Sequence, residues 1–340
     1  MNCGYWGDWY THVFSKGFIL DETDLAEIDM RWSVPIEITE RSAAGVAHYI
    51  ENLKEQGAAQ FNESRVLILG EKGSGKTSLA LRLANPECDM PNAEASTEGV
   101  DIIDWWFPAI LGQTSSEVKV HIWDFAGHVI THAAHRCFMS ERCLYILLIN
   151  SRTEGDTRIE YWLEQILNYG GNSPILIRVN IRDEHNVDLQ ENKLKEEFPS
   201  IIGFYYVDIK TGGKRFEAFR NNVIKIVRDN PLWQNQKIPA SVFKVKEALQ
   251  QRFEQGNEFI GREELEQIAE NNGIFAEKQK QLLENLRVLG ICLWYDDEDM
   301  REFNEMVLNP GWISHGIYRL INCGMNNKKH ILSNCSASIW

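Results

Sequence analysis

The sequence predicts an α/β protein with a mostly parallel six-stranded sheet, followed by a small helical module of winged-helix type. Short apolar runs alternate with helical patterns between residues 64 and 230, as is typical of a sheet covered by crossover helices. A glycine-rich turn directly follows the first apolar run, and helical patterns dominate after residue 231. These observations divide the chain into a helical lead-in over residues 1–60, an α/β domain over residues 61–230 and a second module over residues 231–340.

Six strands are expected in the α/β domain. Residues 118–123 alternate between apolar and polar side chains, which indicates a strand with one wetter face, and residues 99–107 are its expected neighbour. Trp105 and Trp106 fall on opposite faces of that neighbour, so one is expected in the core and the other in an exposed contact patch. The other four strands are continuous apolar runs, as strands buried on both faces should be: residues 66–69, 143–149, 175–179 and 201–207.

The flanking segments are predicted to be mainly helical. Apolar residues recur at helical spacing from Ala47 to Leu53, which predicts a helix over residues 43–55. Pro231 and Pro239 bracket a short linker. The patterns beyond it predict helices over residues 242–253, 262–272 and 277–289, a small hairpin from the runs at 291–295 and 306–308, and a further helix over 311–321.

Composition and charge restrict the class of function. The 340 residues are 44% apolar and 25% charged, which is ordinary for a folded soluble protein. The net charge of −14 argues against binding to nucleic acid, because duplex phosphates attract basic surfaces. The seven cysteines include no C-x-x-C pair, which fits reduced thiols. With no recognisable signal sequence or membrane-spanning segment, a cytoplasmic protein is expected.

The strongest chemical signal is the segment from Gly70 to Thr77. It matches the P-loop pattern G-x-x-x-x-G-K-[ST] and lies between an expected strand and an expected helix. Its glycines allow backbone amides to surround phosphate oxygens, and Lys76 places a positive charge beside the β- and γ-phosphates. The expected phosphate-binding residues are Gly70, Lys72, Gly73, Ser74, Gly75, Lys76, Thr77 and Ser78.

A Mg²⁺ site is expected beside the phosphates. The Thr77 hydroxyl is the expected ligand from the P-loop. Asp124 ends the alternating strand in the sequence D-F-A-G, where its carboxylate holds the ion and the Gly127 amide meets the γ-phosphate. Thr97 lies in the loop before that strand pair and is expected to complete the metal shell when the γ-phosphate is present. An ordinary solvated threonine is the alternative for Thr97.

Two later segments are candidates for recognition of the base. Asn180 and Asp183 follow the fifth expected strand, and an aspartate there accepts hydrogen bonds from N1 and N2 of guanine, a donor pair that adenine lacks. An ordinary strand-end turn is the alternative. Asp208, Ile209 and Lys210 follow the sixth strand, where GTPases carry Ser-Ala-Lys with a backbone amide that meets guanine O6. The second assignment depends on order along the chain.

Hydrolysis would use Lys76, the Gly127 amide and His128. The histidine occupies the usual place of a water-positioning glutamine, and a catalytic and an inert role both stay open. His132 and His135 are spaced like metal ligands, but no further ligand set accompanies them, so a helical face is the preferred interpretation. No arginine finger can be assigned, and unaided turnover is therefore expected to be slow.

These elements occur in the order found in G proteins, and the chain resembles the Roco family. Residues 123–128 resemble the W-D-F-A-G-Q stretch of Roc domains, with spaced His and Phe residues after it. Residues 49–63 resemble the helix and lead-in that precede Roc domains. Residues 239–322 resemble the start of the COR domain that follows Roc.

The resemblance implies a Ras-like P-loop GTPase switch, with GTP or GDP and Mg²⁺ as ligands and protein effectors as partners. It implies a partial COR domain over residues 231–340. Because the later half of COR commonly supplies the dimer contact in this family, a fragment or minimal form with weak or absent dimerisation is expected. A non-hydrolysing nucleotide-binding scaffold and an ATP-using P-loop NTPase are the alternatives.

Overall fold

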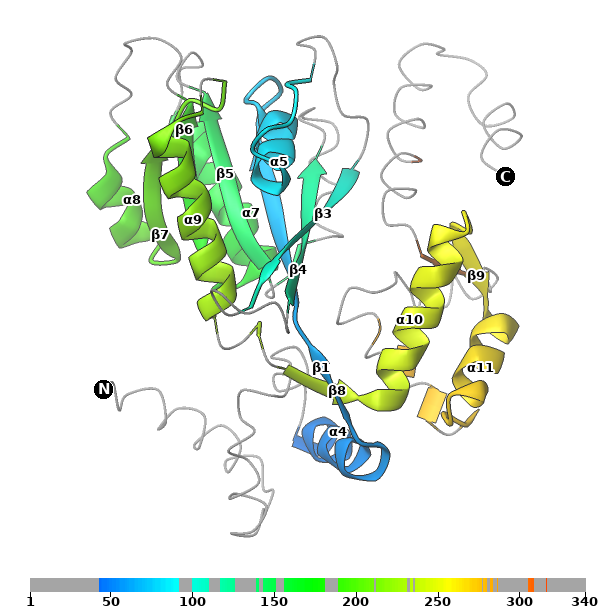
Figure 1. Cartoon of the computed structure of the whole chain (residues 1–340). Coiled ribbons are helices and arrows are strands. Elements are labelled where there is room, and N and C mark those ends of the chain that lie inside the picture. The colour runs from blue at the N-terminus through cyan, green and yellow to red at the C-terminus, as the bar shows by residue number, and fades with distance from the viewer. Residues whose placement is uncertain are drawn as a thin grey trace, which may run out of the picture. The chain divides into compact units, whose positions relative to one another are not determined.

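The computed structural model describes residues 43–91, 100–109, 117–125, 139–140, 143–150, 156–180, 189–210, 212–230, 233–234, 236–276, 278–279, 282–283, 286, 305–308 and 316. The chain divides into two compact units (Figure 1). The described residues between 63 and 230 form a sheet unit. Those between 43 and 62 and between 233 and 308 form a helical unit.

The sheet unit contains one six-stranded sheet. Its strand order is β3-β4-β2-β5-β6-β7, and every neighbouring pair is parallel except the antiparallel pair β3 and β4. The predicted six-stranded, mostly parallel sheet is thus confirmed. The strands are β2 (Glu63–Gly70), β3 (Val100–Pro108), β4 (Glu117–Phe125), β5 (Cys143–Asn150), β6 (Ile175–Asn180) and β7 (Ile201–Tyr206).

Burial explains why these segments are strands. The residues from Val66 to Leu69 in β2 are all fully buried, so this strand lies inside the sheet with both faces covered. On the edge strand β3 the side chains alternate, with Trp105 2% exposed and Trp106 53% exposed. The expectation that one tryptophan is in the core and the other on the surface is confirmed.

Helices cover the sheet. In Figure 1, α9 crosses in front of the sheet and α7 lies behind it. Each has an apolar stripe at helical spacing: Ile159, Trp162, Leu163 and Ile166 are buried in α7, and Phe216, Phe219, Val223 and Val227 in α9. The helices of this unit are α5 (Lys76–Ala84), α7 (Asp156–Gly170), α8 (Glu191–Glu197) and α9 (Lys214–Asp229).

The helical unit joins segments from both sides of the sheet unit in the sequence. Helix α4 (Ala43–Gln56), predicted from its periodicity, leads into β1 (Ala58–Phe61). Strand β1 pairs antiparallel with β8 (Gln236–Pro239), which lies in the segment interpreted from its prolines as a linker. The Tyr49 hydroxyl of α4 donates to the Lys237 carbonyl at 3.2 Å. The lead-in therefore packs with elements that follow residue 231.

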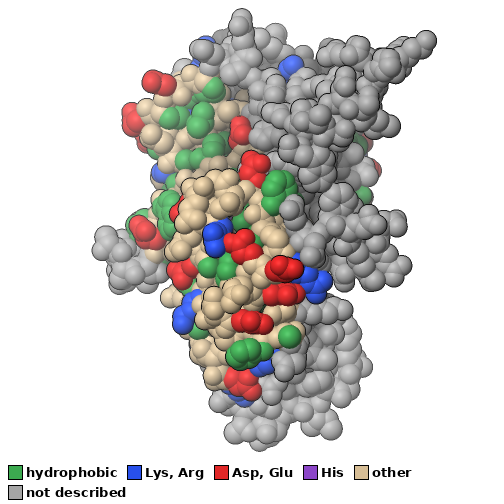
Figure 2. Space-filling model, turned by 90° about the vertical axis from the view of Figure 1, so that its right-hand side faces the viewer, with side chains coloured by type: hydrophobic (Ala, Val, Ile, Leu, Met, Phe, Trp, Pro, Cys, Tyr) green, Lys and Arg blue, Asp and Glu red, His purple; other side chains and the backbone are tan. Residues whose placement is uncertain are grey.

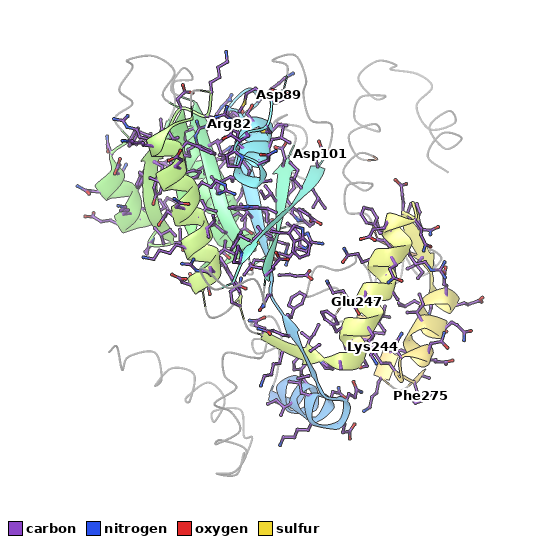
Figure 3. The ribbon with its side chains drawn as sticks, viewed as in Figure 1. Arg82, Asp89, Asp101, Lys244, Glu247 and Phe275 are labelled. Carbon is purple, nitrogen blue, oxygen red and sulfur yellow. The ribbon has the colours of Figure 1, made fainter. Side chains whose placement is uncertain are left out.

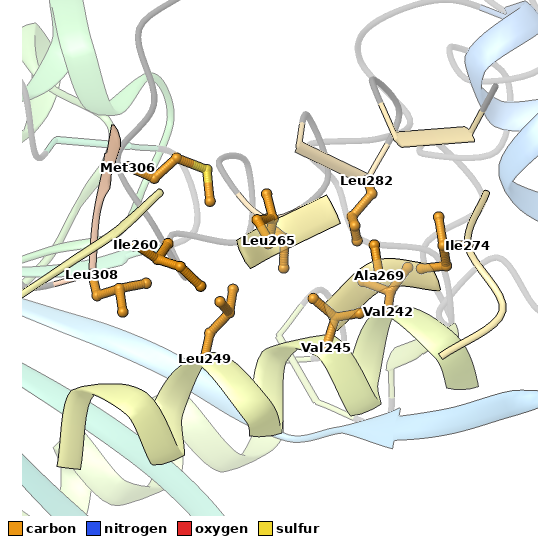
Figure 4. Close-up of a cluster of buried hydrophobic side chains, with 11 residues drawn as sticks. Val242, Val245, Leu249, Ile260, Leu265, Ala269, Ile274, Leu282, Met306 and Leu308 are labelled. Atoms are coloured by element: carbon orange, nitrogen blue, oxygen red, sulfur yellow. The ribbon is translucent and has the colours of Figure 1, made fainter. Parts of the chain in front are cut away.

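A buried apolar cluster holds the rest of this unit together (Figure 4). Helix α10 (Ala240–Glu254) contributes one face, in which Val242, Val245 and Leu249 recur at helical spacing. Leu265 and Ala269 of α11 (Arg262–Asn271) pack against that face. Complete burial of each large aliphatic side chain contributes roughly 1.5–3 kcal/mol, so this cluster accounts for much of the unit's stability. The other members are Ile260, Ile274, Leu282, Leu286, Met306 and Leu308.

The predicted hairpin in this unit is described only in part. Strand β10 (Glu305–Val307) matches the second apolar run, and it pairs antiparallel with β9 (Phe259–Gly261). The first run, residues 291–295, lies outside the described residues, as do most of the helices expected over 277–289 and 311–321.

The described surface carries charges of both signs. On the face in Figure 2, acidic and basic side chains are interspersed with apolar ones. Among the described residues, no helix is long and apolar enough to cross a membrane.

Candidate nucleotide-binding site

The glycine-rich turn connects β2 to α5 and requires glycine at specific positions. Gly70, Gly73 and Gly75 have φ values of 143°, 77° and 92°, in the region that side-chain-bearing residues rarely adopt. A Cβ atom added to Gly70 would lie 2.5 Å from the Leu148 carbonyl oxygen of β5. The turn therefore passes too close to the neighbouring strand for any side chain at Gly70.

Helix α5 begins directly after the turn, so its first residues lie at the candidate site. Gly75 is the residue before the helix, and within the described part of the chain no side chain caps its first turn. The first amides of a helix point along its axis and carry the positive end of its dipole. An anion such as a phosphate group fits this position. Ser74, Thr77 and Ser78 flank it, and Lys72 is exposed at the outside of the turn.

Lys76 is buried at the centre of the turn. Only 6% of the residue is exposed, and its Nζ atom donates to the carbonyl oxygens of Gly70 and Glu71, each at 2.9 Å. Burial lowers the pKa of Lys76 to about 8, and the negative charges of Asp124 and Glu71 partly offset that decrease. A cation held inside a loop in this way provides a fixed charge for phosphate oxygens.

Asp124 lies beside this lysine. It is completely buried near the end of β4, opposite Ile68 of β2 in the parallel register. Its negative charge acts to raise the pKa of Lys76, against the larger effect of burial. The described residues contain no cluster of three or more His, Cys, Asp or Glu side chains that suits a metal ion. One buried carboxylate and the Thr77 hydroxyl fit Mg²⁺, which is commonly bound by one or two protein groups together with substrate phosphates.

The segment after β7 lies next to the glycine-rich turn. The Ile209 side chain is 4% exposed, and a Cβ atom built on Gly75 would lie 3.5 Å from its Cδ1 atom. Asp208 Oδ1 accepts a hydrogen bond of 2.8 Å from the Lys210 amide, which closes a tight turn. The structure therefore brings together two segments that are more than a hundred residues apart in the sequence and that were assigned to phosphate and base.

Several predicted site residues cannot be placed. Thr97, Gly127, His128 and Asp183 lie outside the described residues, and so do His132 and His135. Asn180 is the last residue of β6, and its side chain lies outside the described part.

Three arginines near the site escape the sequence motifs. Arg158 of α7 forms an ion pair of 3.0 Å with Glu71 in the glycine-rich turn. Arg82 of α5, labelled in Figure 3, reaches the segment after β7, where its Nη2 atom lies 3.4 Å from the Lys210 carbonyl oxygen. Arg178 of β6 is fully buried and donates to the Val207 carbonyl. Arg178 could have been noticed in the sequence, because it is a charged residue inside the otherwise apolar run Ile-Leu-Ile-Arg-Val.

Comparison with known families assigns both parts of the chain. Residues 65–183 match the family described as "Ras of Complex, Roc, domain of DAPkinase". Residues 239–338 match the family described as "C-terminal of Roc, COR-A domain".

Individual relatives agree with these matches. The structure of Methanosarcina barkeri Roco2 RocCORdC bound to GDP is similar with a TM-score of 0.66 and 33% identity, and the match covers 79% of each chain. A Roc-COR-CHAT protease of Runella zeae is 24% identical over 286 residues, which is 77% of this chain and 30% of that protein. The Ras-related protein Rab-18 of Caenorhabditis elegans is 25% identical over 54% of this chain and 89% of its own. The chain thus spans less than a third of the Runella protein.

Proposed function

Because the chain belongs to the Roco family, with a Roc domain followed by a COR-A domain, we propose that it binds GTP and GDP with Mg²⁺ and hydrolyses GTP slowly. The proposal is carried by one observation. Lys76, the start of α5 and buried Asp124 converge beside the glycine-rich turn, where the β- and γ-phosphates and their metal ion would lie.

The choice of guanine is supported from two directions. The Roco2 protein of M. barkeri is described as bound to GDP. In this chain, Ile209 packs beside Gly75, which supports a base-binding role for the segment of Asp208 to Lys210 next to the proposed phosphate site. Asn180, at the end of β6, and Asp183 would complete the base site, with Asp183 accepting from N1 and N2.

Mg²⁺ would be held by Thr77 and Asp124, with Thr97 added in the GTP-bound state. When bound, the ion would supply positive charge that neutralises the negative charge developing on the phosphates in phosphoryl transfer. The chain's own contribution is to fix positive charge through Lys76, to donate from the Gly127 amide and to orient the attacking water through His128. We propose that this switch acts on protein effectors in the cytoplasm.

Binding and hydrolysis are tested separately. Lys76→Ala should weaken GTP binding at least about 100-fold, the scale of removing a preorganised donor from a charged site. Lys193→Ala, on the exposed side of α8, is the matched control and should bind like the parent. If Lys76→Ala binds GTP as tightly as the control, the proposed phosphate site is wrong.

Hydrolysis is measured under single-turnover conditions with Mg²⁺. His128→Ala should lower the rate at least about tenfold while GTP affinity stays constant, because water positioning acts only in the transition state. A parent that binds GTP but releases no phosphate would instead make the chain a nucleotide-binding scaffold.

A further inference from the structure

Arg178 is a charged residue in the interior of the sheet unit. It is 0% exposed, and β6 around it is otherwise apolar from Ile175 to Val179. Burying a guanidinium group is costly unless hydrogen bonds compensate for the lost contact with water. Arg178 donates from Nη2 to the carbonyl oxygen of Val207.

Val207 is the point at which the chain leaves β7 for the proposed base-binding loop. Its own amide donates to the Val179 carbonyl at 3.2 Å, so β6 holds Val207 through both its backbone and Arg178. Asp208, Ile209 and Lys210 follow immediately. The side chain of Arg178 thus fixes the entry to the loop.

Arg82 contacts the exit of the same loop. Its Nη2 atom lies 3.4 Å from the Lys210 carbonyl oxygen, and a Cβ atom added to Gly212 would lie only 2.7 Å from its Nη1 atom. Gly212 has a φ of 64°, which lies in the left-handed region that favours glycine. Helix α5, which carries Arg82, is itself held by Arg220, whose Nε atom donates to the Leu83 carbonyl at 2.8 Å.

The two arginines enclose a loop whose sequence departs from that of ordinary GTPases. Asp208 and Ile209 replace Ser and Ala, and the loop is closed by the hydrogen bond between the Asp208 carboxylate and the Lys210 amide. Arginine side chains thus contact the carbonyl oxygens at both ends of this loop, Val207 and Lys210. A backbone amide discriminates well only when it is held in place before the ligand arrives.

We propose that Arg178, together with Arg82, is a positioning residue for guanine selectivity that holds the loop of residues 207–210 where its backbone reads the O6 atom. This inference rests on the proposed guanine-nucleotide binding. It assigns selectivity to residues that do not touch the nucleotide and that lie on β6 and α5.

Two nucleotide analogues separate this role from a general loss of structure. In 6-thio-GTP a sulfur atom, which is a weak acceptor, replaces O6 and leaves N1 and N2 unchanged. Inosine triphosphate lacks only the N2 amino group, which Asp183 is expected to bind. The parent's preference for GTP over 6-thio-GTP reports on the loop, and its preference for GTP over inosine triphosphate reports on Asp183.

The experiment measures affinities for the three nucleotides in Arg178→Met, Arg178→Lys, Arg82→Met and the control Arg215→Met, which alters an exposed residue of α9. In Arg178→Met the preference for GTP over 6-thio-GTP should fall about five- to tenfold, the usual scale of one hydrogen bond. Its preference for GTP over inosine triphosphate should be unchanged. Arg178→Lys keeps a donor and should recover part of the loss, and Arg215→Met should match the parent.

The outcomes are distinguishable. If Arg178→Met weakens all three nucleotides equally, or changes none of them, while the parent prefers GTP to ATP, the positioning role is wrong and the proposed function stands. If the parent binds ATP as well as GTP, both are overturned. Should Arg178→Met fail to fold by circular dichroism, Arg82→Met carries the test, because the same selective loss is expected there.

Discussion

The phosphate side and the base side of the candidate site are built in different ways. The phosphate side is one contiguous segment, Gly70 to Ser78, whose path is imposed by glycine backbone angles and by the start of α5. The proposed base side combines the ends of β6 and β7, and Arg178 and Arg82 contact the loop that follows β7. The phosphate side therefore depends on local conformation, whereas the base side depends on contacts between distant segments.

This difference decides how each side should respond to substitution. A change on the phosphate side should affect every nucleotide equally, since all share the same phosphates. A change on the base side should alter the choice between nucleotides and leave phosphate binding in place. The predictions below test that division from the largest expected effect to the smallest.

The largest effect is expected from Asp183→Asn. Xanthine carries a carbonyl group at C2, which needs a donor, so the amide should weaken GTP and strengthen xanthosine triphosphate. Because a site built for one hydrogen-bond pattern rejects the wrong partner strongly, the ratio of the two affinities should change by roughly 10³ or more. Competition binding with both nucleotides measures it. An equal loss of both would place Asp183 outside the base site.

Gly70→Ala should weaken GTP, GDP and ATP alike by at least about 100-fold. The new Cβ atom would lie 2.5 Å from the Leu148 carbonyl oxygen at a φ of 143°, so the turn must move. Gly73→Ala is the control, because its φ is also positive at 77° but nothing lies within 4 Å of the added atom. It should lower the stability of the fold by about 1–2 kcal/mol through backbone strain alone and weaken the three nucleotides less than Gly70→Ala does. Thermal unfolding measures the stability of the two variants, and nucleotide titration measures their affinities. Equal losses of affinity in both variants would contradict the explanation by the close approach of Gly70 to Leu148.

The smallest effect concerns pH. Because burial lowers the pKa of Lys76 to about 8, this side chain loses its charge in the nucleotide-free protein as pH rises above that value. GTP binding needs the charged form, so affinity should fall about fivefold between pH 8 and pH 9, because the charged fraction drops from about one half to about one tenth. The stability of the nucleotide-free protein should rise over the same range and up to pH 10.5, since the unfolded chain then binds more protons. In Lys76→Ala both of these pH dependences should disappear. Any pH dependence of binding that the variant keeps comes from other groups, including the nucleotide, and is subtracted from that of the parent.

The sequence predicted the sheet well because buried strands appear in it as continuous or alternating apolar runs. The four continuous apolar runs correspond to β2, β5, β6 and β7, and the alternating run corresponds to β4. The strands β1 and β8 were not predicted, because each has four residues and their buried apolar residues, Phe61 and Ile238, are too few to form a pattern. Their pairing is a contact between segments far apart in the sequence, and local hydrophobic periodicity does not report such contacts.

The same reasoning applies to the site. The P-loop was predicted from the sequence because its eight consecutive residues match one pattern that indicates both the glycine-rich turn and its phosphate-binding groups. The assignment of Ile209 and Lys210 depended on order along the chain and stays a prediction, with Ile209 lying beside Gly75 in the structure. Arg82 and Arg178 contribute through backbone carbonyl groups of the loop, and no local sequence pattern encodes such contacts.

The central claim is that this chain is a guanine-nucleotide-binding protein of the Roco family, and a nucleotide titration of the unmodified chain tests it most directly. GTP, GDP and ATP should be compared at one Mg²⁺ concentration near neutral pH, where Lys76 is charged. The account predicts that GTP and GDP both bind, and that ATP binds at least about 100-fold more weakly because adenine lacks the donor pair for Asp183. Equal affinity for ATP and GTP, or the absence of binding by either guanine nucleotide, would contradict it.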